Sequence, residues 1–263
     1  MLALGGCGGM RLMYSFADNY YVGIVQDYFD PTSEQLRAVR TKAEQVLAWH
    51  RQYELPLYVA MFDQAAQKTH DGLTEEEVFW GITLLRTRYD TLAQRIVAAN
   101  ASLLTELSAQ NLAALEKKFS SENAKLEPTY LDADHARRDK RRAERVQNQF
   151  ERWVGPLRSE QVAIVAAWVA AAPTASINWY LERVNRQQRM LTALRAERDP
   201  SSLAAQLTGQ WLGRGAAAER RMRNEARVAA LILSIDQSLS AAQRTRAVQR
   251  MQQYADDFRS LSQ

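Results

Sequence analysis

A short pattern that occurs at five places constrains the fold of this chain more than any other feature. In its general form an apolar residue precedes Ser or Thr, two spacers and Gln, and individual copies depart from it. The copies occupy residues 30–36, 73–77, 107–111, 157–161 and 239–243. A Ser or Thr in this position accepts a hydrogen bond from a first-turn N–H, and a Gln or Glu three residues later reaches back to the cap. Each copy therefore predicts the start of a helix.

The composition agrees with a chain made of helices. Of the 263 residues, 46% are hydrophobic and 24% are charged, which is typical of a globular protein, and only eleven Gly and six Pro are present. The caps are unevenly spaced, which argues against a regular solenoid. We therefore expect an all-α protein, an irregular bundle of about eight to ten helices joined by short capped turns. Residues 14–263 are interpreted as one helical domain, with two lobes at 14–156 and 157–263 as an alternative.

The N-terminal segment contains the single cysteine of the chain, Cys7. A lone cysteine excludes a disulfide framework or a Cys-based zinc site within one chain. The sequence Leu4-Gly5-Gly6-Cys7 resembles the lipobox of bacterial lipoproteins. This resemblance implies that Cys7 is lipidated, and we therefore interpret residues 1–13 as a signal remnant and anchor. The six residues before Cys7 are too few for a complete secretory signal. A chance terminal cysteine is the alternative.

Apolar periodicity predicts where several helices face the core. Tyr14, Tyr21 and Tyr28 repeat every seven residues on one predicted helix face. Helical spacing in the segment after Gly72 predicts that six side chains point inward: Val78, Ile82, Leu85, Tyr89, Leu92 and Ile96. Pro56 is expected to kink or restart a helix, and a helix break is expected around residues 127–132. The longest apolar stretch, residues 162–172, is too short to span a membrane and predicts a buried helix.

The net charge of +4 and the basic segment 137–145 raise the possibility of an anionic partner. Such a segment can contact phosphate groups of lipid or nucleic acid. The alternative is a solvated helix face, which the mixed charge favours because Asp139 and Glu144 interrupt the basic residues. Lipidation of Cys7 would exclude nucleic acid by compartment.

Several motifs, taken in order, resemble a family of uncharacterised Gram-negative helical lipoproteins. After the Leu-Gly-Gly-Cys segment they are residues 28–30, 49–51, 54–56 with Tyr58, and 254–258. The resemblance covers nearly the whole chain and implies no established activity. A weaker resemblance, carried by Leu239-Ser240-Ala241-Ala242-Gln243, is to the Spy and CpxP periplasmic chaperones. The same residues are also ordinary capping chemistry.

No common catalytic motif is present, so we expect no enzyme activity, no cofactor and no metal site. The exception to weigh is His50 with Glu54, four residues apart and hence on one helix face. They belong to a candidate binding surface that mixes charged and aromatic side chains: Asp27, Asp30, Trp49, His50, Arg51 and Glu54. Two interpretations stay open. The residues form a recognition surface, or they form a polar seam between helices in which Arg51 is paired.

Together these features predict a non-catalytic binding or structural protein of the cell envelope. The lipid anchor implies attachment to a membrane, and Gly8 after Cys7 lacks the Asp associated with inner-membrane retention. The expected address is thus the periplasmic face of the outer membrane, with an envelope protein as partner or client and no nucleic acid. The alternatives are a Spy-like envelope chaperone and a metal- or acid–base-dependent enzyme centred on His50 and Glu54.

Overall fold

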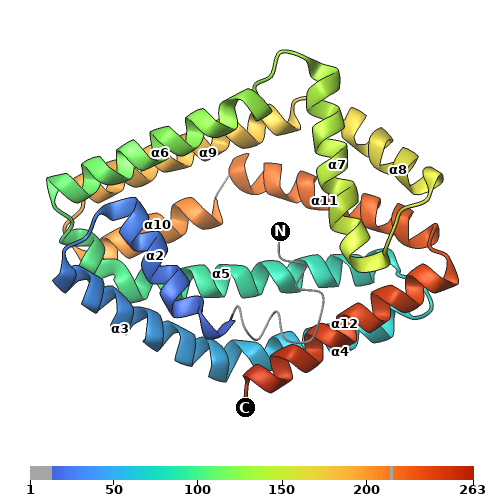
Figure 1. The fold of residues 1–263 in the computed structure, drawn as a ribbon, viewed down its shortest axis with the longest axis horizontal. Helices are drawn as coiled ribbons and strands as arrows, with labels where there is room; N and C mark the ends of the chain where they lie inside the picture. The colour runs from blue at the N-terminus through green and yellow to red at the C-terminus, as the bar shows by residue number, and fades with distance from the viewer. Residues whose placement is uncertain (1–13, 214–215) are drawn as a thin grey trace.

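The computed structural model describes residues 14–213 and 216–263, and in these residues the chain is helical throughout, without a strand. Figure 1 shows the arrangement. The elements are α2 (Ala17–Phe29), α3 (Ser33–Trp49), the π-helical turn η1 (His50–Glu54), α4 (Leu55–Thr69), α5 (Glu75–Thr105), α6 (Ala109–Tyr130), α7 (His135–Val154), α8 (Ser159–Ala170), α9 (Ala175–Ala196), α10 (Pro200–Leu212), α11 (Ala216–Gln237) and α12 (Ala241–Leu261). The all-α prediction is confirmed. The predicted N-terminal segment 1–13, including Cys7, lies outside the described residues.

The predicted caps form at the helix starts. The Thr32 hydroxyl accepts from the Gln35 N–H at 3.2 Å, and the Gln35 side chain accepts from the Thr32 N–H at 2.9 Å. The same reciprocal pairs begin α5, α6 and α12, where the caps are Thr74, Ser108 and Ser240. The start of α8 differs because residue 158 is Arg, whose side chain donates and cannot cap an N–H. This cap keeps only the bond from the backbone N–H of residue 158 to the residue 161 side chain.

Helices from both halves of the chain pack against each other. The α12 helix packs along α4, α10 along α5, and α9 along α6, while α2 and α3 form a hairpin. In Figure 1, α5 crosses the middle of the molecule, with the α6–α9 pair above it and the α4–α12 pair below it at the right. The suggested boundary at residue 156 therefore separates stretches of sequence whose helices are in contact.

Two clusters of buried side chains form the core. The first core cluster joins α6, α9 and α10 and consists of Leu112, Leu115, Leu191, Ala193, Leu194, Leu203 and Leu207. The second core cluster joins α8 and α11 and consists of Val165, Val169, Leu231 and Ile235. The second cluster includes two residues of the apolar stretch 162–172, but Val162 is exposed, so only one face of α8 is buried.

The turn η1 shows how the sequence joins α3 to α4. Pro56 has no N–H to donate, and its ring clashes with the carbonyl of the preceding turn in a regular helix. The chain widens just before this residue, and the Leu55 N–H donates to the His50 carbonyl five residues earlier. The expected kink at Pro56 is thus accommodated by a π-helical turn, after which Pro56 lies in the first turn of α4.

The structure contradicts the predicted burial of two side chains of α5 and confirms the predicted end of α6. Leu85 and Tyr89 are exposed, although helical spacing predicted them inward. The break expected around residues 127–132 is confirmed, since α6 ends at Tyr130, although Pro128 still lies inside the helix. Tyr130 stacks on Trp179 with ring centroids 4.5 Å apart, and this contact favours keeping the last turn of α6 helical.

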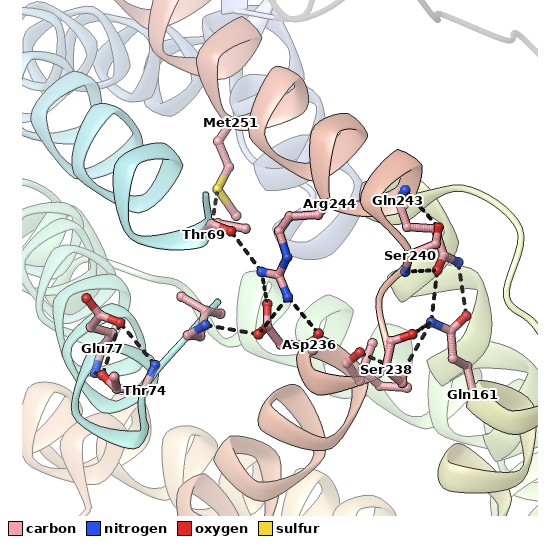
Figure 2. A network of polar contacts seen from close by, with 12 residues as sticks. Thr69, Thr74, Glu77, Gln161, Asp236, Ser238, Ser240, Gln243, Arg244 and Met251 are labelled. Atoms are coloured by element: carbon pink, nitrogen blue, oxygen red, sulfur yellow. Dashed lines mark hydrogen bonds and ion pairs between the residues drawn. The ribbon is translucent and has the colours of Figure 1, made fainter. Parts of the chain in front are cut away.

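A buried ion pair fastens the α4–α5 turn to the α11–α12 turn (Figure 2). Both carboxylate oxygens of Asp236 accept bonds from the Arg244 guanidinium, at 2.8 and 3.1 Å. Asp236 also accepts from the Leu73 N–H at 2.9 Å, and Arg244 donates to the Thr69 carbonyl at 2.8 Å. Gly72 has a φ of 105° in this turn, a conformation that favours glycine. The polar groups of the pair thus hold two distant turns of the fold together.

A second network beside it joins the starts of α8 and α12 (Figure 2). The buried amides of Gln161 and Gln243 bond to each other at 3.0 Å. The Gln161 amide also donates to the Ser238 hydroxyl at 3.1 Å, and the Gln243 amide donates to the Pro156 carbonyl at 3.0 Å. These two capping residues therefore also connect one helix start to the other.

Among the helices of residues 14–213 and 216–263, no single one is both long and apolar enough to cross a bilayer. The helices α8 and α9 meet the criterion only together, across a bend of 57°.

Candidate functional site

The structure separates the six residues of the predicted surface into two groups. Asp27 and Asp30 lie at the turn between α2 and α3, whereas Trp49 ends α3 and residues 50–54 follow it at the other end of that helix. A helix of 17 residues is about 25 Å long. Because the hairpin is antiparallel, the group at 49–54 faces the start of α2, where Tyr14 lies, and not its end. The prediction that all six lie close together is therefore wrong.

Asp27 and Asp30 hold the hairpin against α6. The Asp27 carboxylate is 2.6 Å from Nζ of Lys118. The Asp30 carboxylate accepts from the Gln110 amide at 3.2 Å, and its backbone carbonyl accepts from the Asn111 amide at 3.0 Å. Asp30 ends α2 in the left-handed region, with φ at 47°. These contacts describe a structural turn.

His50 lies in an aromatic layer between the start of α2 and the α4–α12 pair. Its Nδ1 is 3.0 Å from the Tyr14 hydroxyl, and its ring centroid is 5.7 Å from that of Tyr58. Tyr58 in turn packs on Phe258 at 5.4 Å, so the motifs at 49–58 and 254–258 meet in space. Burial lowers the pKa of His50 below its ordinary value of 6.5. Arg51 covers the Tyr14 ring at 5.6 Å. This arrangement favours a neutral imidazole inside a packed seam.

Trp49 and Glu54 contact arginines of α5. The Arg95 guanidinium covers the Trp49 ring at 5.4 Å. Glu54 is only 3% exposed, and its Oε2 lies 3.5 Å from Nη1 of Arg88. Burial raises the pKa of Glu54, and the Arg88 charge opposes this shift. The expected pairing with Arg51 does not form because the π-helical turn replaces the regular 3.6-residue spacing on which the prediction rested.

In the described ranges no cluster of three or more His, Cys, Asp or Glu side chains is arranged to hold a metal ion. His50 and Glu54 each have a partner in the fold, Tyr14 and Arg88 respectively. The geometry at this place is that of a seam between helices.

The basic segment of α7 is not a uniformly solvated face. Arg138 and Arg142 are buried. Arg142 donates to the Ala172 carbonyl at 2.7 Å, just beyond the C-terminus of α8, where a positive charge is stabilised by the helix dipole. The guanidinium groups of Arg142 and Arg227 lie 4.8 and 5.0 Å from the centroid of the Trp168 ring. Part of the basic segment therefore serves packing.

A cavity of about 710 Å³ lies between α2, α3, α5, α6, α9 and α10, and α11 contributes Arg221 to its lining. Most of its lining side chains are apolar or aromatic. Tyr21 and Tyr28 of α2 contribute to it, so two members of the seven-residue repeat line the cavity, whereas Tyr14 contacts His50. Burial raises the pKa of Tyr21, while a hydrogen bond with Asn100 opposes this shift.

One end of the cavity is formed by side chains that also pack on the first core cluster. They are Tyr28, Phe29, Val97, Leu104, Leu107, Phe119 and Met190. Apolar groups here are supported from behind by buried leucines, which gives this end a fixed apolar wall. We refer to it as the apolar end.

The other end carries four arginines, from α5, α9 and α11. Arg86 is neutralised by Glu225, with its Nη1 2.7 Å from Oε2. The other three, Arg183, Arg186 and Arg221, have no carboxylate within ion-pair distance in the described part of the chain. We refer to these three as the arginine group. Asp90 is the acidic side chain among the lining residues.

Two rings lie at the same end. Tyr89 and Trp211 are both exposed, and their ring centroids are 5.2 Å apart. Partial burial raises the pKa of Tyr89, and the nearby Arg186 charge opposes this shift. Periodicity had assigned Tyr89 to the core. Sequence reasoning missed the cavity as a whole because its lining comes from seven helices.

Comparison with known proteins places this chain in a family. A model of a family of unknown function, DUF6279, matches residues 27–214, which include every helix that lines the cavity except α11 and most of α2. No curated protein and no solved structure matches the chain. The motif at 254–258 lies beyond the matched residues, and so does Cys7. Because the match covers more than half of the 263 residues, the chain belongs to the DUF6279 family, whose function is unknown.

Proposed function

We propose that this protein is a non-catalytic binding protein that holds the apolar part of a ligand in the cavity between α2, α3, α5, α6, α9 and α10. The observation that carries the proposal is the cavity itself, about 710 Å³ with a mostly apolar lining. Ligand pockets have volumes of about 300–1,000 Å³ and combine an apolar lining with a few polar groups. This cavity has both properties.

The arrangement of titratable groups supports binding rather than catalysis. Nucleophilic and acid–base sites place a reactive group within hydrogen-bonding distance of its base. Apart from the arginines, the titratable side chains of the lining are Tyr21, Tyr28, Tyr89 and Asp90, and Tyr21 is engaged with Asn100. His50 and Glu54 do not line the cavity. These features of the lining support binding, and the enzyme centred on His50 and Glu54 stays an alternative from the sequence.

The chaperone alternative rested on the Leu-Ser-x-x-Gln segment at 239–243. Ser240 and Gln243 use their polar groups to begin α12 and to bond to Gln161 and the Pro156 carbonyl. These residues have a complete structural role, so the segment gives no separate support to client binding. A macromolecular partner in the envelope stays an expectation from the sequence.

The cavity is tested with N-phenylnaphthylamine, an uncharged apolar dye whose fluorescence rises in apolar surroundings. Wild-type protein should bind it saturably. Val97→Phe and Val25→Phe, which add bulk from α5 and α2, should each weaken binding at least tenfold, with unchanged helical circular dichroism. Leu85→Phe is the matched control on α5, because Leu85 is exposed and outside the lining. Absence of saturable binding by the wild-type protein, or binding as tight as wild type by both cavity variants, would contradict the proposal.

We infer further that the protein is a lipoprotein anchored at Cys7, facing the periplasm from the outer membrane. Support comes from the lipobox-like Leu4-Gly5-Gly6-Cys7 and from Gly8. In cells fed a clickable fatty acid, the natural gene product should be labelled and fractionate with outer membranes, whereas Cys7→Ser should be unlabelled. Equal labelling of the two would exclude the anchor and leave the cavity proposal untouched.

A further inference from the structure

We propose that the ligand is a single-chain amphiphile with an anionic head group, bound with its head at the arginine group and its tail at the apolar end. This inference rests on the proposed function and deepens it, because it assigns the chemical class of the ligand. It depends on two properties of the cavity: its two ends differ in chemistry, and the charge at one end is unbalanced.

The separation of the two ends is clearest along α5, which lines the cavity over most of its length. Arg86, Tyr89 and Asp90 line it near one end, and Leu103 and Leu104 near the other. Eighteen residues of helix between positions 86 and 104 correspond to about 27 Å, whereas on α9 the four residues from Arg186 to Met190 correspond to about 6 Å. A lipid tail spans half of a hydrocarbon core of about 30 Å, which is about 15 Å. The cavity is thus long enough for a tail at one end and a head group at the other.

The charge at the arginine group is not balanced by the protein. The Nε of Arg183 donates to the neutral Asn123 amide oxygen at 3.1 Å. Arg221 donates to the backbone carbonyl of Leu212, and its Nε is buried without a hydrogen-bond partner in the described residues. Arg186 has no carboxylate within ion-pair distance in that same part of the chain. Against these three cations stands Asp90 alone, since Glu225 already neutralises Arg86.

An anionic head group fits this excess of positive charge. Guanidinium groups bind carboxylate and phosphate through paired N–H donors, and such charge-assisted bonds are roughly twice as strong as neutral ones. A cationic head would be repelled by three guanidinium groups, and an uncharged ligand would leave their positive charge unbalanced. Polyanions without an apolar part do not fit, because the apolar end would remain unfilled. A fatty-acid carboxylate and the phosphate of a single-chain lipid share the required chemistry.

The experiment measures displacement of N-phenylnaphthylamine by ligands that share one oleyl chain and differ in the head. Oleate, oleoyl lysophosphatidate, oleyl alcohol and oleylamine are used below their critical micelle concentrations. Oleate, lysophosphatidate or both should displace the dye at concentrations at least tenfold lower than the alcohol, and the amine should be weakest. The ratio of oleate to lysophosphatidate then tells which anionic head the site prefers.

Variants assign the preference to the arginine group. Arg186→Gln and Arg221→Gln should each reduce the advantage of the anion over the alcohol about fivefold. Arg189→Gln is the matched control, because Arg189 lies on α9, pairs with Glu182 at 2.9 Å and is outside the lining. Because the two variants lie on different helices, a local folding defect in one of them would not explain the same loss in the other.

The outcomes separate this inference from the proposed function. Saturable dye binding with equal displacement by anion, alcohol and amine would overturn the anionic head and leave the apolar cavity established. An anion preference that survives in both Arg186→Gln and Arg221→Gln would also overturn it. If wild-type protein binds neither the dye nor any oleyl ligand, the proposed function itself is wrong.

Discussion

Asp236 shows at the level of a single residue how much of this fold depends on a buried charge. It is 5% exposed and holds Arg244 and the Leu73 N–H at once. Asp236→Ala should cost about 3 kcal/mol of unfolding free energy, because it leaves a mostly buried guanidinium without its partner. Glu116→Ala is the control. Glu116 pairs with Arg195, and both side chains are about half exposed, so Glu116→Ala should lower the unfolding free energy by less than about 1 kcal/mol. Urea titrations of both variants measure their unfolding free energies. If Asp236→Ala loses no more stability than Glu116→Ala, the buried pair contributes no more to stability than an exposed one.

His50 gives a prediction about pH. Because burial lowers its pKa below 6.5, the unfolded chain takes up a proton at higher pH than the folded protein does. Between 6.5 and the lowered value, the unfolded state therefore binds more protons, and the unfolding free energy falls as pH falls. His50→Gln should remove this component of the pH dependence and cost about 1 kcal/mol at about pH 7.5, through loss of the packed contact with Tyr14. A variant with unchanged stability and an unchanged pH profile would refute the seam and return His50 to the surface.

The residue scale also shows where sequence reasoning succeeds. Thr32, Thr74 and Ser240 were predictable as caps because capping depends on residues three positions apart, which the sequence displays directly. The partner of Glu54 was not predictable. It is Arg88, 34 positions away on α5, and the π-helical turn that directs Glu54 toward it departs from the helical spacing that the prediction assumed.

At the scale of the helical element, glycines distinguish positions that need a special backbone from positions that do not. Gly155 ends α7 with φ at 80°, and a Cβ there would collide with the Arg246 guanidinium. Gly155→Ala should destabilise the protein by about 1–2 kcal/mol from backbone strain alone. Gly81 lies inside α5, and a Cβ at this position would meet no neighbouring atom within 4 Å, so Gly81→Ala should stabilise by about 0.5–1 kcal/mol. Thermal melts should move in opposite directions, and a shift of the same sign in both would contradict this assignment.

Helix starts were more predictable than helix faces. The α5 helix has 31 residues and packs against α10, α11, α3 and α4 at different points along its length. A single periodic stripe describes one contact face, whereas the buried face of α5 changes with each neighbour. Leu85 and Tyr89 were therefore assigned to the core although they are exposed. The end of α6 was predictable only to within a few residues, since the contact of Tyr130 with Trp179 comes from a helix 49 positions later.

At the scale of the whole molecule, the cavity is the feature that the sequence could not reveal. Its lining is assembled from helices between Tyr21 and Arg221, and no local pattern reports which of their faces meet. The repeat of Tyr21 and Tyr28 was visible but equally compatible with a core stripe. The arginine group was invisible for the same reason. Arg183 and Arg221 look like ordinary surface arginines until the fold brings them to one end of an apolar space.

The last prediction concerns cooperativity, and it decides between one folding unit and the two lobes 14–156 and 157–263. The pairs α4–α12, α5–α10 and α6–α9 each join one half of the chain to the other, so each half buries part of its apolar surface against the other. Urea unfolding followed by far-ultraviolet circular dichroism and by tryptophan fluorescence should give one coincident transition, the usual test of two-state behaviour. A ligand at about one hundred times its dissociation constant should shift that whole transition by about 2.7 kcal/mol. Two separated transitions, with only one of them moved by the ligand, would establish two lobes and confine the cavity's stabilising effect to one of them.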